Sequence, residues 1–206
     1  MGATVRKSGF VRIAIDNSVI NWKAFQGRER AIQADDEKRN DYEAIQRLFQ
    51  LQERCRVVLV VVDQVDREAS KTSNESKRAK LLDTLKLCKE KFYLTRFETS
   101  TFSKKAAKAR GKSGINLEEG AYWITEDNER RIKEYVASGR TRKEKVDLEV
   151  LATVAIAGVR LFVTVDDRLL ANGQIREFVK RKDGIWIYRP SEILMLVDAS
   201  LGESEG

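Results

Sequence analysis

Six consecutive apolar residues at positions 57–62, VVLVVV, constrain the fold more than any other feature of the sequence. Alternate residues of a β-strand face opposite sides of a sheet, so a strand that is apolar throughout must be covered on both faces. Such coverage is typical of a parallel sheet with helices packed on its two sides. The run therefore predicts a central strand of an α/β fold.

Shorter apolar segments alternate with longer amphipathic ones along most of the chain, as expected for strand–helix units. Strands are predicted at residues 11–15, 57–62, 92–97, 161–165 and 185–188, and helices at residues 41–54, 77–91, 147–157 and 174–182. The fold class expected is α/β, with a Rossmann-like open parallel sheet of about five strands and helices on both faces. A chain of 206 residues suits a single domain over residues 1–206.

Residues 99–142 differ from the rest of the chain because they are rich in Lys, Gly, Ser and Glu, with one apolar island at residues 121–123. We interpret this segment as an insertion or a mobile basic arm, with some helix near residues 126–136.

The sequence contains no histidine, which excludes Ser-His-Asp triads, histidine general bases and histidine-ligated zinc sites. Two cysteines, Cys55 and Cys88, form no metal-binding motif and are expected to be buried thiols. Apolar runs are too short for a membrane span, and Asp16 interrupts the first of them, so no signal core is formed. We therefore expect a cytoplasmic protein whose chemistry depends on carboxylates, lysine or hydroxyl groups.

Acidic residues follow three predicted strands, with Asp16 after the first, an acidic segment at residues 63–68 after the second, and Asp166 near the end of the fourth. Ligands of open parallel sheets bind at this edge. Asp147 is expected to begin the helix at residues 147–157 and to stand near the same edge. Taken singly, each aspartate is explained equally well as a helix cap. As a set, the acids repel one another and favour a hard cation such as Mg²⁺ or Mn²⁺.

In this order and spacing, the acids resemble those of the PIN-domain nuclease family. The resemblance covers roughly residues 10–98 and 145–198 and rests on four motifs: IDNS with Asp16, VDQVDRE with Glu68, DLEVLATVA with Asp147, and FVTVDD with Thr164 and Asp166.

The resemblance implies a PIN-like parallel sheet of five strands and cleavage of RNA that depends on Mg²⁺ or Mn²⁺. It assigns Asp16, Asp147 and Asp166 as the most direct metal ligands, with Glu68 completing the catalytic pocket. The residues implied to support them are Asn17, Ser18 and Thr164, which would orient ligands or water, and Asp167, which would substitute for or support Asp166. Asp63 and Asp66 remain alternatives to Glu68 as the acid that follows the second strand.

The net charge of +7 favours polyanionic partners, because neutralising phosphates releases their condensed counterions. Tyr122 and Trp123 are available for base stacking, whereas Trp22, Phe25, Trp186 and Tyr188 are expected in the core or at an interface. Any single basic run is explained equally well as a solvated surface. The residues expected to contact a nucleic-acid backbone are Lys104, Lys105, Lys108, Arg110, Lys112, Arg140, Arg142 and Lys143.

The leading hypothesis is a metal-dependent endoribonuclease that hydrolyses RNA phosphodiester bonds with water activated by carboxylate-bound Mg²⁺ or Mn²⁺. One alternative is a catalytically inactive PIN-like module for RNA binding or assembly. Another is a phosphatase or a DNA-directed nuclease that uses the same carboxylates. An antitoxin-like protein or a second copy of the chain is a candidate protein partner.

Overall fold

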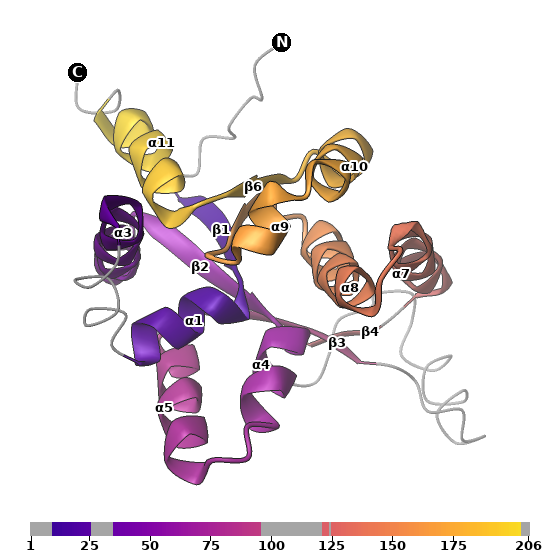
Figure 1. The fold of residues 1–206 in the computed structure, drawn as a ribbon, viewed down its shortest axis with the longest axis horizontal. Coiled ribbons are helices and arrows are strands. Elements are labelled where there is room, and N and C mark those ends of the chain that lie inside the picture. The colour runs from indigo at the N-terminus through magenta and orange to yellow at the C-terminus, as the bar shows by residue number, and fades with distance from the viewer. Residues whose placement is uncertain (1–9, 26–34, 96–120, 124, 203–206) are drawn as a thin grey trace.

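The structure is a computed structural model that describes residues 10–25, 35–95, 121–123 and 125–202. Its strands are β1 (Val11–Ile15), β2 (Val57–Val62), β3 (Glu90–Thr95), β4 (Ala121–Trp123), β5 (Leu161–Val163) and β6 (Trp186–Tyr188). They form one sheet in the order β4-β3-β2-β1-β5-β6, and every neighbouring pair is parallel (Figure 1).

The helices within the described ranges are α1 (Asn17–Ala24), α3 (Asp36–Glu53), α4 (Asp63–Ser70), α5 (Glu75–Lys86), α7 (Glu126–Ser138), α8 (Arg142–Ile156), α9 (Asp167–Ala171), α10 (Gly173–Asp183) and α11 (Pro190–Gly202). Figure 1 shows α1, α3 and α5 on one side of the sheet and α7, α8 and α10 on the other. None of the helices described here is long and apolar enough to cross a membrane.

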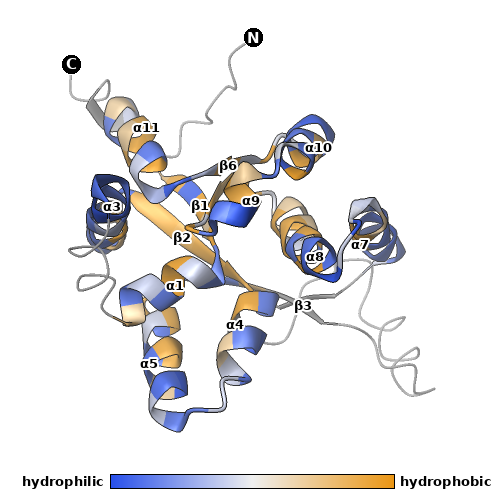
Figure 2. Ribbon diagram, viewed as in Figure 1, coloured by the Kyte–Doolittle hydropathy of each residue, from blue (hydrophilic) through white to orange (hydrophobic). Residues whose placement is uncertain are grey.

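The apolar run at residues 57–62 forms β2, between β1 and β3, as the sequence predicts. Val57, Leu59 and Val60 are completely buried, because helices cover the sheet on both faces. Figure 2 shows β2 as hydrophobic and the covering helices as two-sided, with hydrophobic and hydrophilic faces. The α/β class with a parallel sheet is therefore confirmed.

Among the described residues the sheet has six strands rather than about five, because β4 adds an edge strand from within residues 99–142. The helix expected near residues 126–136 is α7, which packs on α8 through the buried side chains of Ile132 and Tyr135. Arg131 also pairs with Asp183 of α10 at 2.7 Å. The last part of this segment thus belongs to the folded body, whereas residues 99–120, including the basic cluster at 104–112, lie outside the described residues.

One expectation about burial is wrong. Cys88 is buried as expected, but Cys55 is exposed because it lies in the turn between α3 and β2, with a positive φ of 56°. Trp186, on the edge strand β6, is 44% exposed and so lies outside the core, with Lys180 Nζ 4.0 Å from the centre of its ring. Trp22 and Phe25, by contrast, pack against the core.

The sheet order reverses beside β1, with β2 on one side and β5 on the other. Connections that leave neighbouring strands toward opposite sides open a crevice at their carboxyl ends, where ligands of such folds bind. A ligand site is therefore expected among the residues that follow β1 and β5.

Candidate active site

A cavity of about 430 Å³ opens at the carboxyl ends of β1 and β5. All four acids predicted from the sequence line it: Asp16, Glu68, Asp147 and Asp166. Asn17 and Ser18 also line it, as expected for supporting residues. The acids come from four different elements, so the folded chain is needed to bring them together.

Asp16 lies between β1 and α1, where an aspartate often caps the helix. Its side chain caps no backbone N–H of α1. The carboxylate instead accepts hydrogen bonds at Oδ2 from Ser18 Oγ at 2.6 Å and from Thr164 Oγ1 at 2.8 Å. Two hydroxyl groups thus fix the orientation of Asp16 in the cavity wall, and capping does not explain this residue.

Thr164 follows β5 and links its end to Asp16 at the end of β1. Its side chain is completely buried, and Oγ1 also accepts a hydrogen bond from the backbone N–H of Asp166 at 3.0 Å. The backbone N–H of Val165 donates to Ser18 Oγ at 3.2 Å. Through these hydrogen bonds, the side chains of Ser18 and Thr164 connect Asp16 to the segment that carries Asp166.

Glu68 is the acid of α4 that lines the cavity. Its Oε2 accepts a hydrogen bond from Asn17 Nδ2 at 2.8 Å. Its rival Asp63 is mostly buried and pairs with Arg67 at 3.2 Å. Five residues along an α-helix correspond to a rotation of about 140°, so Asp63 and Glu68 cannot share a face. The side chain of Asp66 is outside the described part of the chain.

Asp147 does not begin a helix as the sequence suggested. Helix α8 begins at Arg142, because Thr141 and Glu144 form a capping box that starts the helix earlier. Asp147 is therefore interior to α8, where it cannot cap the helix. Its carboxylate lines the cavity together with Val146 and Val150 of the same helix, while Leu148 and Leu151 are buried in the core.

Asp166 does cap a helix. Its Oδ1 accepts hydrogen bonds from the backbone N–H groups of Arg168 at 2.9 Å and Leu169 at 3.4 Å, at the start of α9. Its second oxygen, Oδ2, accepts a hydrogen bond from the guanidinium of Arg168 at 3.1 Å. Asp167 does not support Asp166, because it pairs with Arg189 at 2.6 Å and does not line the cavity.

Arg168 pairs with two of the acids, and sequence reasoning missed it. Its Nη1 lies 2.7 Å from Asp147 Oδ2, and its Nη2 lies 3.1 Å from Asp166 Oδ2. The guanidinium therefore bridges two of the four acids and neutralises part of their charge. A signal was present in the sequence, because Arg168 stands two residues after Asp166 and a cation there is within reach of its carboxylate.

Two of the acids have perturbed pKa values. Burial raises the pKa of Asp147, the bond from Arg168 opposes the shift, and the negative charges of Asp166 and Asp16 add to it. Burial of the carboxyl group raises the pKa of Glu68, with a further contribution from the charge of Asp16, while the bond from Asn17 opposes it. Protons and cations therefore compete for these carboxylates.

The donors of the cavity suit a hard divalent cation, because they are carboxylate and hydroxyl oxygens. Asp147 Oδ2 is buried and forms an ion pair with Arg168 at 2.7 Å. Within the part of the chain that the structure describes, no three acids or cysteines are close enough together to hold a metal ion. The guanidinium of Arg168 instead bridges Asp147 and Asp166.

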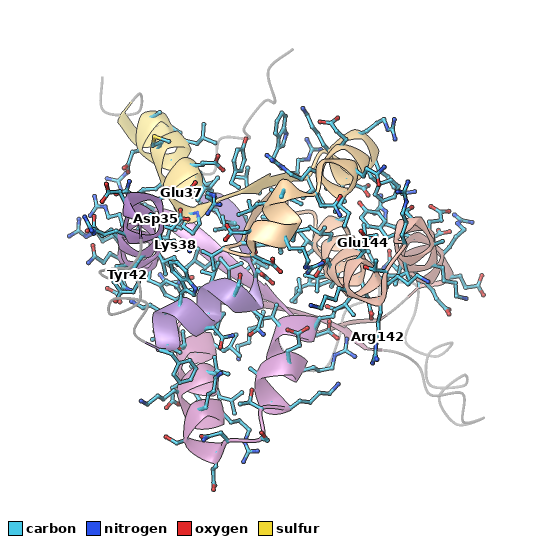
Figure 3. All side chains as sticks on the ribbon, viewed as in Figure 1. Asp35, Glu37, Lys38, Tyr42, Arg142 and Glu144 are labelled. Carbon is cyan, nitrogen blue, oxygen red and sulfur yellow. The ribbon has the colours of Figure 1, made fainter. Side chains whose placement is uncertain are left out.

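Basic residues lie at the start of α8. Arg140, Arg142 and Lys143 are exposed, and Figure 3 shows Arg142 and Glu144 at this end of the helix. Arg142 lies five positions before Asp147, about 7.5 Å along the helix axis and about 140° around it. The two side chains therefore leave α8 on different faces. The other predicted contacts, from Lys104 to Lys112, fall outside the described residues.

Comparison of the chain with models of known protein families gave no match, and comparison with characterised proteins gave no significantly similar sequence. Its function is therefore inferred from the residues of the cavity.

Proposed function

We propose that this chain is a PIN-like, metal-dependent endoribonuclease. The observation that carries the proposal is the gathering of four acids from four separate elements in one cavity at the point where the sheet order reverses. A purely structural role would not require Asp16 to leave its helix uncapped and to be held by two hydroxyl groups instead. Preorganisation of this kind is expected where a site must bind a cation or a substrate.

Asp16, Asp147 and Asp166 would hold Mg²⁺ or Mn²⁺, and Glu68 would complete the pocket. The metal, when bound, supplies the positive charge that activates water and neutralises the charge developing on the scissile phosphate. Ser18 and Thr164 keep the Asp16 carboxylate oriented, and Asn17 does the same for Glu68. The net charge of +7 and the exposed cations at the start of α8 support a polyanionic substrate.

The proposal is tested by incubating the protein with labelled single-stranded RNA and Mn²⁺. Asp16→Asn and Asp147→Asn keep the size of each side chain but remove a charged ligand, so we expect either change to lower the cleavage rate at least about 100-fold. Asp83→Asn, at an exposed residue of α5, is the matched control and should cleave like wild type. Equal cleavage by the wild type and both site variants would refute the proposal. A matched DNA strand measures the preference for RNA.

The bridge made by Arg168 favours a second candidate, a non-catalytic RNA-binding module. A guanidinium that neutralises Asp147 and Asp166 does part of what a metal ion would do. This candidate predicts RNA binding that is unchanged by Mn²⁺ and by Asp16→Asn, with no cleavage by the folded wild type. Cleavage that requires Mn²⁺ and Asp16 would exclude it.

A further inference from the structure

The guanidinium of Arg168 pairs with two of the four acids that line the cavity, Asp147 and Asp166. We propose that Arg168 is an exchangeable counter-ion of this site, which bridges Asp147 and Asp166 in the metal-free protein and is displaced when Mg²⁺ or Mn²⁺ binds. The inference rests on the proposed function, because it concerns how the same acids acquire their metal. Its consequence is that the affinity for metal is set by competition with an internal ion pair.

The contacts of the guanidinium show why it and a metal would exclude each other. Nη1 is 2.7 Å from Asp147 Oδ2, the buried oxygen of that carboxylate, and Nη2 is 3.1 Å from Asp166 Oδ2. Burying a carboxylate oxygen without a cation costs free energy. We therefore expect Arg168 to pair with it in the metal-free protein and the metal ion to do so in the metal-bound protein. A divalent ion held by Asp147 and Asp166 would compete with the guanidinium for the negative charge of the same two carboxylates.

The side chain of Arg168 can leave without disturbing the fold. It is 40% exposed, so the guanidinium can move into solvent without crossing the core. The backbone N–H of Arg168 donates to Asp166 Oδ1, whereas its side chain contacts Oδ2. Helix α9 therefore keeps its cap when the guanidinium moves.

A second ion pair provides a matched comparison. Arg131 and Asp183 lie 2.7 Å apart, as do Arg168 and Asp147, and the side-chain exposures of the two pairs are close, 40% and 11% against 40% and 17%. Arg131 and Asp183 join α7 to α10 and do not line the cavity of the four acids. Removing Arg131 therefore measures the effect of losing such an ion pair elsewhere in the molecule.

The test is Mn²⁺ binding without RNA, measured by electron paramagnetic resonance or calorimetry at about pH 8, where the carboxylates are ionised. We expect Arg168→Gln to bind Mn²⁺ about tenfold more tightly than wild type, which corresponds to about 1.4 kcal/mol. Arg168→Lys, which keeps the charge but cannot bridge two carboxylates in a planar fork, should give an intermediate affinity. Arg131→Gln should bind Mn²⁺ like wild type.

Thermal unfolding is the second readout and also checks that each variant folds. Without metal, Arg168→Gln should melt below wild type, because the Asp147 carboxylate loses its partner. Saturating Mn²⁺ should raise its melting temperature more than that of wild type, since binding to the folded state alone stabilises it. For Arg131→Gln, the increase with Mn²⁺ should equal that of wild type.

The possible outcomes separate this inference from the proposed function. Equal or weaker Mn²⁺ binding by folded Arg168→Gln, with binding by wild type intact, would overturn the exchange and leave the metal site standing. Absence of Mn²⁺ binding in both proteins would overturn the metal site itself and the exchange with it. Tighter Mn²⁺ binding by Arg168→Gln but not by Arg131→Gln would support both the metal site and the exchange of Arg168 with the metal.

Discussion

Replacing Thr164 with valine should destabilise the protein by about 3 kcal/mol, although the two side chains have nearly the same shape. Thr164 is completely buried, and its hydroxyl donates to the Asp16 carboxylate at 2.8 Å and accepts from the Asp166 N–H at 3.0 Å. A hydrogen bond to a charged group contributes about 1.5–3 kcal/mol and a neutral one about 1 kcal/mol. Thr164→Val removes both hydrogen bonds, and their summed contribution to the free energy of unfolding is about 2.5–4 kcal/mol.

The free energy of unfolding would be measured by urea denaturation followed by circular dichroism. Thr84→Val is the matched control, because Thr84 is also buried but donates only to the Lys80 carbonyl within α5, at 2.9 Å. We expect this control to lose less than about 1 kcal/mol, since a helical carbonyl keeps its backbone partner. Equal losses in the two variants would refute the conclusion that Thr164 couples Asp16 to the end of β5.

Four further predictions concern charge. Arg189→Met should lower the free energy of unfolding by about 3–5 kcal/mol, because buried Asp41 loses its cationic partner at 3.1 Å and keeps the hydrogen bonds from Ser191, which carries no charge; a urea titration showing less than about 1 kcal/mol would contradict this. Because burial raises the pKa values of Glu68 and Asp147, Mn²⁺ affinity should still rise with pH where ordinary carboxylates are already ionised, and calorimetry showing no such rise would count against the raised pKa values. In the metal-free protein the same two shifts should stabilise the fold at low pH, and urea titrations should show this contribution being lost as the pH rises through the raised pKa values. Arg142→Gln should weaken RNA binding and reduce the slope of log affinity against log salt by about 0.7, and an unchanged slope would place Arg142 away from the RNA.

The central strands could be predicted because their signal is local. The run of residues 57–62 is apolar at every position, and only a sheet covered on both faces can bury it. The edge strand β4 could not be predicted in the same way, because it has three residues and lies in a polar segment. Its pairing with β3 is decided by the tertiary fold, which local composition does not reveal.

The acids of the cavity were also accessible from the sequence, since three of them follow strands whose carboxyl ends share one edge of the sheet. The start of α8 was placed too late, because the capping box of Thr141 and Glu144 lies in a polar segment without an apolar stripe. The bridge from Arg168 to Asp147 spans 21 residues and depends on how α9 lies against α8. No spacing rule for a single helix or strand predicts such a contact.

The most direct test of the proposed activity is the fate of the phosphate during RNA cleavage in ¹⁸O-labelled water with Mn²⁺. Attack by water places one solvent oxygen on each cleaved phosphate, whereas attack by the neighbouring 2′-hydroxyl gives a 2′,3′-cyclic phosphate without solvent oxygen. Mass spectrometry of the products should show one ¹⁸O per cleaved bond with wild type and no such product with Asp16→Asn. A cyclic phosphate, or labelled product at the wild-type rate from Asp16→Asn, would contradict metal-dependent hydrolysis at these four acids.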